Sequence, residues 1–235
     1  MSLKNWDNKT WLSSTDYIKA FNNFLIRQIK LDKNSSILDI GCGRGKIIGN
    51  LSSKLRLNKM PLGIDIEKHK DRDKRIVFTK LDALKFLKNN KKEFDLILLK
   101  QTIHFFEYKD IKKLIFLCMK SLKNKGKLII FTLETKRNEI PAFSLMKDRL
   151  KKSLRRDQKI IEFLSNSYPG NIKKKFSYRV EISKKKYIKM IKDRYISTLL
   201  NFRQGEILEG IEEIRKKYKE KIYFNDKLIC LILKK

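Results

Sequence analysis

The chain has 235 residues, and 57 lysines and arginines against 26 aspartates and glutamates give it a formal net charge of +31. That length suffices for one well-filled α/β core, and no apolar run is long enough to cross a bilayer or to form a secretory signal. The three cysteines lack C-x-x-C spacing, which argues against a disulfide framework or a zinc site, so we expect a soluble cytoplasmic protein without a bound metal.

The excess of positive charge has two explanations that the sequence leaves open. Lysine greatly outnumbers arginine and is spread through every segment, with short runs only at 173–175 and 184–186. An AT-rich coding sequence produces this pattern on solvated faces whatever the function. A field of this size also attracts polyanions, so a nucleic-acid partner stays an alternative that we do not favour.

The first thirty residues predict a helix that is preceded by aromatic side chains. Apolar residues at helical spacing over 18–29 follow the serine pair Ser13-Ser14, which offers the N-cap of the helix. The segment with Trp6 and Trp11 can close as a lid over a bound cation, because aromatic faces attract cations. The alternative is that Trp11 and Tyr17 simply pack in the core.

A short apolar strand running into three alternating glycines spans residues 36–46, with the sequence SILDIGCGRGK. A strand, a glycine turn and a helix in this order form the unit that binds nucleotide-like cofactors in open α/β sheets. The spacing is G-x-G-x-G rather than G-x-G-x-x-G. Asp39 stands two residues before Gly41, where a carboxylate would repel a pyrophosphate. The sequence therefore favours a cofactor that carries positive charge.

Two further apolar runs are each followed by an acid. Asp65 ends the run that begins at Pro61, about twenty residues beyond the glycine loop, where an acid can accept hydrogen bonds from both hydroxyls of a ribose. Its alternative role is to cap a helix. Asp82 follows a strand over 76–79 and also stands where a helix would begin.

A fourth strand, 94–100, ends beside the first strand at the point where strand order reverses, so residues 100–106 should border the crevice of the sheet. Substrate chemistry is expected there. His104 can act as a base, orient a substrate or pack as a wall residue, because an imidazole titrates near neutral pH. The other histidine, His69, is expected to be exposed to solvent.

The second half of the chain is less regular. The predicted elements are helix 109–121, strand 128–133, helix 141–165, a turn at 168–171, strand 176–182, helix 183–191, helix 205–218, and a hairpin over 222–233 that turns at Asn225-Asp226. We expect one domain over 1–235. It comprises an N-terminal lid or helix (1–30), a cofactor-binding core (36–133), a helical cap or insertion (134–220) and the final strands (221–235).

The segment 37–131 resembles the class I methyltransferases that depend on S-adenosylmethionine (SAM). DIGCGRG at 39–45 is similar to their motif I, and LDA at 81–83 is similar to their adenine-binding position. The layout is similar to the small-molecule branch that includes trans-aconitate methyltransferases, domains of the type 11 and type 25 kind. In that branch Q-x-x-H/Q-W/F follows the fourth strand, as QTIHF does at 101–105. Lys100 departs from the small or polar residue of many relatives.

This resemblance implies a Rossmann-like, doubly wound α/β fold. Its mostly parallel seven-stranded sheet would have an antiparallel C-terminal strand. It implies SAM as cofactor, S-adenosylhomocysteine (SAH) as product, and the following site. Residues expected at the cofactor are Trp11, Tyr17, Asp39, Gly41, Cys42, Gly43, Gly45, Asp65, Ile66, Asp82, Ala83 and Lys100. Residues expected at the acceptor are Gln101 and His104 as catalytic groups, with Phe105, Arg179, Arg194 and Arg203 as further contacts.

The expected activity is an in-line methyl transfer (EC 2.1.1) to a small molecule whose acceptor is a carboxylate, hydroxyl, amine or thiol. An RNA-directed methyltransferase and a non-catalytic SAM-binding protein are the alternatives. The Asn/Asp-Pro-Pro-Tyr turn of DNA amino methyltransferases is absent after the fourth strand, and no cysteine follows a proline as in cytosine C5 enzymes.

Overall fold

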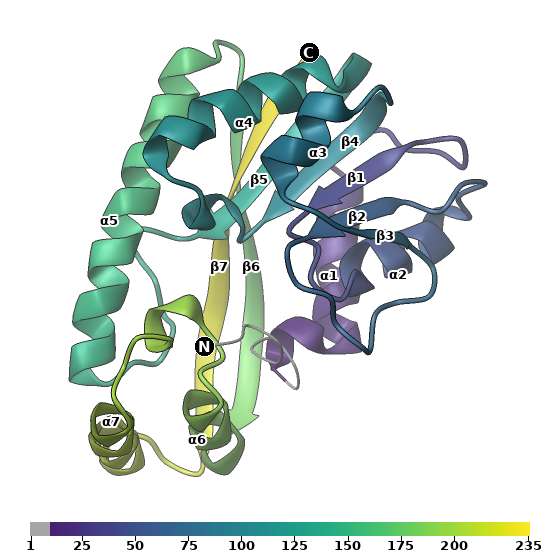
Figure 1. Ribbon diagram of the computed structural model, residues 1–235. Helices are drawn as coiled ribbons and strands as arrows, with labels where there is room; N and C mark the ends of the chain where they lie inside the picture. The colour runs from purple at the N-terminus through teal and green to yellow at the C-terminus, as the bar shows by residue number, and fades with distance from the viewer. Residues whose placement is uncertain (1–9) are drawn as a thin grey trace.

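The computed structural model describes residues 10–235 and contains a central seven-stranded sheet flanked by helices (Figure 1). The strand order is β3-β2-β1-β4-β5-β7-β6, with β1 to β5 parallel and β7 antiparallel to both of its neighbours. The strands are β1 (Ile37–Ile40), β2 (Leu62–Asp65), β3 (Val77–Lys80), β4 (Phe94–Lys100), β5 (Leu122–Leu133), β6 (Ile172–Ser183) and β7 (Lys221–Lys234). This is the predicted doubly wound fold.

Strand order reverses between β1 and β4, which are the two strands at the centre of the sheet. Both are mostly apolar, and Leu38, Ile97 and Leu98 have no exposed surface. Strands buried on both faces read as continuous apolar runs, which is why their positions were predictable from sequence. The reversal leaves a crevice at the carboxyl ends of the strands, the usual ligand site of such sheets.

Helices cover both faces of the sheet, and each face has its own apolar cluster. On one face α1 and α2 pack together, and α6 and α7 cover the long strands β6 and β7. On the other face lie α3, α4 and part of α5 (Figure 1). The helices are α1 (Thr15–Ile26), α2 (Lys46–Leu55), α3 (Ala83–Asn89), α4 (Tyr108–Lys120), α5 (Ser144–Ser167), α6 (Lys184–Lys192) and α7 (Gln204–Lys217). Within residues 10–235, none of the helices combines the length and apolar character needed to span a membrane.

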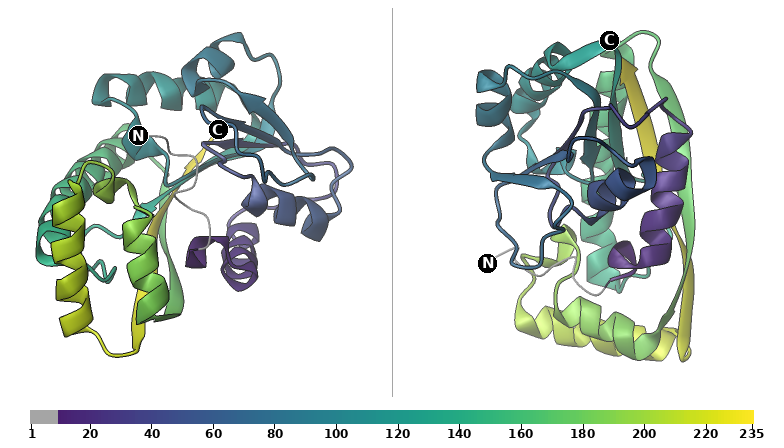
Figure 2. Two further views of the ribbon diagram at one scale, coloured as in Figure 1. Left: turned by 60° about the horizontal axis from the view of Figure 1, so that its bottom comes forward. Right: turned by 90° about the vertical axis from the view of Figure 1, so that its right-hand side faces the viewer.

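The C-terminal half adds a second tier to the molecule. Figure 2 shows β6 and β7 extending well past the parallel strands, with α6 and α7 packed beside their far end. The predicted hairpin over 222–233 is wrong, because β7 is one strand of 14 residues that passes straight through Asn225-Asp226. Both side chains are held in the strand by distant partners: Asn225 Nδ2 donates to Glu139 Oε2 (2.8 Å) and Asp226 Oδ2 accepts from Trp11 Nε1 (3.1 Å).

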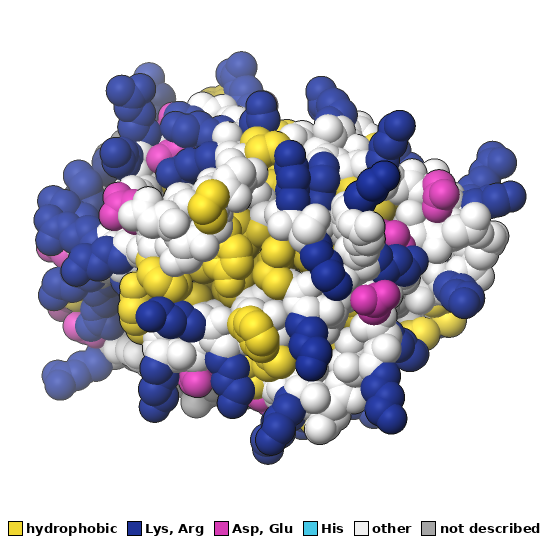
Figure 3. All heavy atoms as spheres, turned by 90° about the horizontal axis from the view of Figure 1, so that it is seen from above, with side chains coloured by type: hydrophobic (Ala, Val, Ile, Leu, Met, Phe, Trp, Pro, Cys, Tyr) yellow, Lys and Arg dark blue, Asp and Glu magenta, His cyan; other side chains and the backbone are white. Residues whose placement is uncertain are grey.

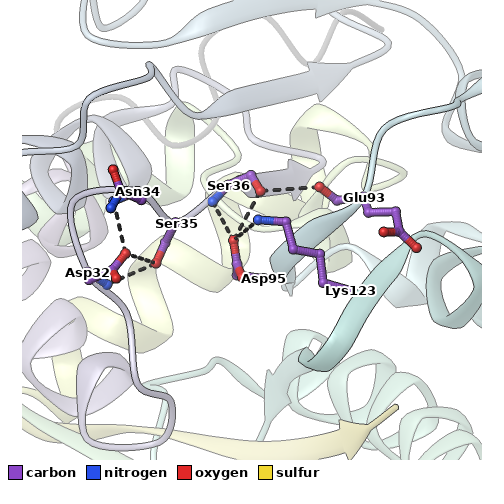
Figure 4. Close-up of polar contacts among 7 residues, drawn as sticks. All are labelled: Asp32, Asn34, Ser35, Ser36, Glu93, Asp95 and Lys123. Atoms are coloured by element: carbon purple, nitrogen blue, oxygen red, sulfur yellow. Dashed lines mark hydrogen bonds and ion pairs between the residues drawn. The ribbon is translucent and has the colours of Figure 1, made fainter.

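At the opposite, amino-terminal ends of the strands, a polar network ties β1 to β4 and β5 (Figure 4). The Asp95 carboxylate accepts from the backbone N–H of Ser36 (2.7 Å), from the Ser36 hydroxyl (3.0 Å) and from Lys123 Nζ (2.8 Å). Burial raises the pKa of Asp95, but the bonds from Lys123 and Ser36 outweigh it and hold that pKa below its usual value. The network therefore stabilises the fold when Asp95 is ionised.

We expect Asp95→Asn to lower the free energy of unfolding by about 1–2 kcal/mol at pH 7, because hydrogen bonds to a charged group are lost. A carboxyl with a depressed folded pKa stabilises above its unfolded pKa of about 4, and that contribution disappears as the pH falls through the folded value. The gap between variant and wild type should thus narrow below about pH 4 in urea titrations. Asp148→Asn, at an exposed position of α5, is the control and should show no such trend.

Candidate functional site

A cavity of about 870 Å³ lies at the carboxyl ends of β1, β2 and β4. At one end it is lined by the glycine loop, the ends of β2 and β3, and the start of α3. At the other end it is lined by the loop after β4, one side of α5, residues 195–201 and Asp226 of β7. The segments of the first end were predicted to hold a cofactor, and the second end is continuous with it.

The glycine loop between β1 and α2 turns so tightly that its glycines have left-handed backbone angles, with φ of 72° at Gly41. A Cβ atom placed on Gly41 would lie 2.3 Å from the hydroxyl oxygen of Thr102, at the end of β4. Real Cβ contacts are never that short, so both the φ angle and the neighbouring loop require glycine there. This packing brings the loop after β4 against the cofactor end of the cavity.

Asp65 closes the glycine loop from the end of β2. Its Oδ2 accepts from the backbone N–H of Gly43 (2.8 Å), and its Oδ1 accepts from the backbone N–H of Glu67 (2.9 Å). Each carboxylate oxygen can accept a second hydrogen bond, so this side chain can hold the loop and still receive two donors from the cavity. The same carboxylate also fills the alternative role predicted for Asp65, because its hydrogen bond from Glu67 caps the residues that follow β2.

Asp39 is buried near the end of β1, and its charge interacts with half-buried Lys100 at the end of β4. Burial raises the pKa of Asp39 to about 7, an effect that Lys100 partly offsets. Burial also lowers the pKa of Lys100 to about 8, against the opposing charges of Asp226 and Asp39. The Lys100 ammonium lies 5.3 Å and 5.4 Å from the ring centroids of Tyr17 and Phe21. Asp39 Oδ1 receives no hydrogen bond from the described residues.

Exposed apolar side chains mark the far wall of the cofactor end. Ile66 and Leu81 line the cavity with 57% and 37% of their surfaces exposed, which is unusual for large aliphatic residues beside a core. Asp82 caps α3 by accepting from the backbone N–H of Lys85 (3.0 Å), and Ala83 is buried behind it. These two aliphatic faces and the cap acid form a slot that suits a flat apolar ring.

The loop after β4 is strained and braced. Gln101 has a φ of 53°, which is uncommon outside glycine and occurs often at functional sites. Its backbone N–H is fixed by Phe131 O (2.8 Å) and its side-chain carbonyl accepts from Lys100 Nζ (3.3 Å). Arg156 of α5 donates to the backbone carbonyls of His104 (2.9 Å) and Phe106, so α5 holds this loop against the cavity.

His104 lines the cavity with its ring against exposed Phe105, at a centroid distance of 4.3 Å. Burial, and then the charge of Arg156, lower the pKa of His104 to about 4, so its imidazole is neutral at pH 7. No described residue gives or takes a hydrogen bond at its Nε2 atom. His69 is a correction: it is only 6% exposed and lines the cavity instead of facing solvent.

The structure brings most of the predicted site residues to the cavity wall. All twelve predicted cofactor residues line it except Tyr17, which is fully buried among Phe21, Phe176 and Tyr178 behind Lys100. Gln101, His104 and Phe105 line its other end. Trp11 lines the cavity too, but its ring packs against Tyr195 and Phe224 as a core residue does. Trp6 lies outside the described residues.

The three arginines predicted to hold the acceptor are not at the cavity, which corrects that part of the site. Arg179 is exposed on β6, Arg203 is exposed before α7, and Arg194 donates to the carbonyl of Leu199 (2.6 Å). Arg149 and Arg156 of α5 line the cavity in their place. The sequence could have indicated them only through the register of α5, since they share one face with buried Leu150 and Leu154 nearby.

Two buried acids of the cavity were missed by the sequence analysis. Asp226 of β7 is 1% exposed and Asp157 of α5 is 5% exposed. Asp157 Oδ2 accepts from the Thr132 hydroxyl (2.8 Å), at the end of β5. Asp226 was predicted to lie in a turn, and no local sequence pattern indicated a role for Asp157. Both were missed because the residues that bury them are distant in the sequence.

The charge of the cavity differs from that of the chain. Among the described residues, eight acids line it against six lysines and arginines, although bases outnumber acids 57 to 26 over the sequence. The acids are Asp39, Asp65, Glu67, Asp82, Glu107, Asp110, Asp157 and Asp226. The bases are Arg44, Lys46, Lys100, Arg149, Lys152 and Arg156.

We compared the sequence and the fold of this chain with those of known proteins. A family model described as a methyltransferase domain matches residues 31–194. No curated protein sequence matches the chain. The plantazolicin methyltransferase BpumL, in a solved complex with SAH and a pentazolic desmethylPZN analog, is similar in fold. Its TM-score is 0.54 at 16% identity, over 98% of this chain and 88% of that one.

Two other solved structures are similar in fold. A SAM dependent methyltransferase from Archaeoglobus fulgidus has a TM-score of 0.52 at 18% identity, over 93% of this chain and 94% of that one. A precorrin-6y C5,15-methyltransferase from Geobacter metallireducens GS-15 has a TM-score of 0.50 at 12% identity, over 91% of this chain and 87% of that one. At such identities the likeness concerns the fold.

Proposed function

The chain belongs to the methyltransferase domain family, whose model matches residues 31–194, and we propose that it transfers the methyl group of SAM to a small molecule held in the same cavity. The charge of the cavity wall carries this proposal. SAM carries a sulfonium and an ammonium, and a wall with more acids than bases suits such a ligand. Membership of a small-molecule branch similar to trans-aconitate methyltransferases is part of the proposal.

SAM is the cofactor of the family, and the residues at the cofactor end fit its parts. The unpartnered Oδ1 of Asp39 suits the ammonium, the free lone pairs of Asp65 suit the ribose hydroxyls, and the exposed faces of Ile66 and Leu81 suit the adenine. Bound there, SAM would supply an activated methyl group and a neutral thioether leaving group. The absence of a side chain at Gly41 lets Thr102 of the loop after β4 pack against this end of the cavity.

The acceptor end would act mainly by positioning, which alone can supply much of the rate of a bimolecular transfer. His104 is suited to orient the acceptor through Nε2, rather than to remove its proton. Its pKa of about 4 makes it a weak base at neutral pH. Gln101, held at a positive φ by the Phe131 carbonyl, presents its side chain between Lys100 and this end of the cavity.

The basic surface is the observation that favours an RNA-directed enzyme instead. In Figure 3, lysines and arginines stand around the whole outline of the face and surround apolar surface, without forming one continuous groove. A nucleic acid reaching the cavity would meet a wall in which acids outnumber bases among the described residues, so this wall offers phosphate no excess of positive charge. The distribution of charge therefore supports a small acceptor over a polyanion.

The acceptor class is tested by supplying SAM with a labelled methyl group to the purified protein, together with a pool of metabolites or, separately, with cellular RNA. We expect label in the small-molecule fraction only. A second measurement repeats the transfer at increasing salt, because phosphate-dependent binding weakens steeply with salt and binding of a small acceptor changes little. Label confined to RNA, with strong salt dependence, would contradict the proposal.

We also expect the affinity for SAH to fall as the pH is lowered through 7. The ammonium of SAH favours an ionised Asp39, whereas burial raises the pKa of the free side chain to about 7. Below pH 7 Asp39 must lose a proton before SAH can bind, which costs up to about tenfold in affinity per pH unit. Calorimetric titrations at pH 7.5 and 5.5 should differ by more than about tenfold for the wild type and much less for Asp39→Asn. Equal wild-type affinities would refute the role of Asp39.

A further inference from the structure

The loop after β4 leaves two carbonyl groups without a backbone donor. Its only regular structure is one turn of 3₁₀ helix, Ile103–Phe105. Among the described residues, no backbone N–H donates to the carbonyls of His104 and Phe106. Carbonyls at the end of a helical turn need a donor from elsewhere, such as a side chain, because the turn itself supplies none. The shape of this part of the loop therefore depends on a side chain outside it.

Arg156 of α5 supplies the donors for both carbonyls. Its Nη1 donates to the carbonyl of His104 (2.9 Å), and its Nη2 donates to the carbonyl of Phe106. A guanidinium carries its N–H groups in a planar fork, so one side chain can bridge two carbonyls, whereas the ammonium of a lysine is a point charge on a flexible stem. Two bonds from one rigid group fix both the position and the direction of the loop.

The part of α5 that presents Arg156 is anchored to the sheet. The next residue, Asp157, accepts from the Thr132 hydroxyl at the end of β5 (2.8 Å). Ile160 and Ile161, one turn further along α5, are fully buried in the apolar cluster on this face of the sheet. The same stretch of helix thus holds the end of β5 and the loop after β4, so the guanidinium ties the loop to a packed support.

The loop carries the imidazole of the acceptor end. His104 lines the cavity, and its Nε2 has no hydrogen-bond partner among the described residues. Its own backbone carbonyl is one of the two that Arg156 holds. Burial, and then the charge of Arg156, lower the pKa of His104 to about 4, which keeps the ring neutral. Both the placement and the protonation state of this imidazole thus depend on Arg156.

The start of the loop is fixed by other contacts. The Gln101 N–H donates to the carbonyl of Phe131 (2.8 Å), and the Thr102 hydroxyl donates to the carbonyl of Lys100 (3.1 Å). Thr102 is also the residue that packs against Gly41 of the glycine loop. Loss of the Arg156 bonds should therefore disturb the acceptor end and leave the cofactor end in place.

We propose that Arg156 is a positioning residue for methyl transfer, which holds the loop after β4 through two carbonyls so that His104 Nε2 is presented to the acceptor. In this role Arg156 acts through the loop and not on the reacting atoms. The inference rests on the proposed function, since it assigns Arg156 a part in that same transfer. A displacement of about 1 Å in such a support can cost on the order of 100-fold in rate.

Two substitutions separate the bridging fork from the charge. Arg156→Lys keeps a positive charge but cannot bridge both carbonyls in the same way, and Arg156→Gln removes the charge as well. Arg155→Gln is the matched control, because Arg155 is the preceding residue of α5, is exposed and does not line the cavity. Arg156 is exposed too, so we expect all three proteins to fold, which thermal unfolding checks.

The first measurement is the rate at which label passes from SAM to a metabolite pool, together with the affinity for SAH. We expect both Arg156 variants to lose at least about tenfold in rate, with a change in SAH affinity of less than about threefold and no change in Arg155→Gln. A wild-type rate in Arg156→Lys would overturn the inference, because the charge alone would then suffice. An equal loss of SAH affinity, or the same loss of rate in Arg155→Gln, would overturn it as well.

The second measurement follows the loop without turnover. The chain has two histidines, so NMR spectra of protein labelled at histidine give two imidazole signals, and His69→Gln shows which of them is His104. In Arg156→Gln we expect the His104 signal to move and to titrate at higher pH than in the wild type. The reason is that loss of the nearby cation favours the protonated ring. An unchanged signal and titration would overturn the inference.

The outcomes separate this inference from the function on which it rests. If the wild type labels small molecules and Arg156→Gln labels them at the same rate, the positioning role alone is wrong. If the wild type binds SAH and labels no small molecule, the proposed function fails, and the role of Arg156 in that transfer fails with it.

Discussion

Gly41→Ala is expected to destabilise the protein by about 2–4 kcal/mol and to weaken SAH binding by at least tenfold. A left-handed φ costs an L-residue about 1–2 kcal/mol, and forcing a methyl group into a packed site costs a further 1–3 kcal/mol. Gly41 has a φ of 72° and its Cβ would lie 2.3 Å from the Thr102 hydroxyl. The loops after β1 and β4 meet at this contact, so displacement of either deforms the cofactor end of the cavity.

Two other glycines provide matched controls. Gly170 also has a positive φ, of 80°, but a Cβ there would meet nothing within 4 Å, so Gly170→Ala measures the backbone strain alone. Gly205 lies in the first turn of α7 without a positive φ and with open space around it, so Gly205→Ala should be neutral or slightly stabilising. Thermal unfolding and SAH titrations of all three separate strain from collision. If Gly41→Ala matched Gly170→Ala in both stability and SAH affinity, a clash between the new methyl group and Thr102 would be refuted.

Lys100→Met is expected to cost about 1–2 kcal/mol at pH 8, where a pKa of about 8 leaves about half of the Lys100 side chains charged, because the variant leaves Asp39 and Asp226 buried without their shared cation. Burial already raises the pKa of both carboxyls, and Lys100 counteracts that shift in each. An acid whose folded pKa lies above its unfolded value destabilises the protein increasingly as the pH rises between the two values. The deficit of the variant should therefore shrink between pH 8 and pH 5, as the acids take up protons.

Urea titrations at pH 5 and pH 8 measure this pH dependence. Lys85→Met, at an exposed site on α3, is the control and should differ from the wild type by less than about 0.5 kcal/mol at either pH. A Lys100→Met protein as stable as the wild type at pH 8 would mean that Lys100 does not neutralise these acids. The same result would mean that Lys100 does not couple Asp226 electrostatically to Asp39 at the cofactor end.

The cofactor end could be predicted from sequence because its geometry is local. Gly41, Asp39 and Asp65 each lie at the end of a short buried strand, and in a parallel sheet such ends meet at one edge. Their residue types also suit their backbone: Gly41 needs a positive φ, and Asp65 satisfies the N–H groups of the turn. Spacing along the chain therefore carried most of the information on this part of the site.

The acceptor end could not be predicted in the same way, because its residues are positioned by distant partners. Asp226 follows an asparagine, a pair that favours turns, but Trp11 and Glu139 satisfy the two side chains and β7 continues through them. Tertiary contacts over 86 and 215 residues thus override local propensity. Arg179 and Arg203 were predicted to contact the acceptor because they are cationic. In the structure both are exposed to solvent, on β6 and before α7.

How the positive charge is distributed over the molecule could not be predicted from the sequence. The sequence reports +31 for the whole chain, which indicates an affinity for polyanions. Only the fold shows that acids outnumber bases in the described part of the cavity wall, while lysines and arginines stand around the outline of the face in Figure 3. Net charge over the whole chain therefore does not describe the balance of acids and bases at the cavity.

We propose that the cavity at the carboxyl ends of β1, β2 and β4 binds SAM through Asp65 and the glycine loop. Calorimetric titration of SAH into the wild-type protein and into Asp65→Ala tests it most directly. We predict one saturable site per chain in the wild type and an affinity at least about 100-fold lower in the variant, since the proposed ribose contacts and the support of Gly43 would be lost together. Absence of SAH binding to the wild type, or equal affinities in the two proteins, would contradict the account.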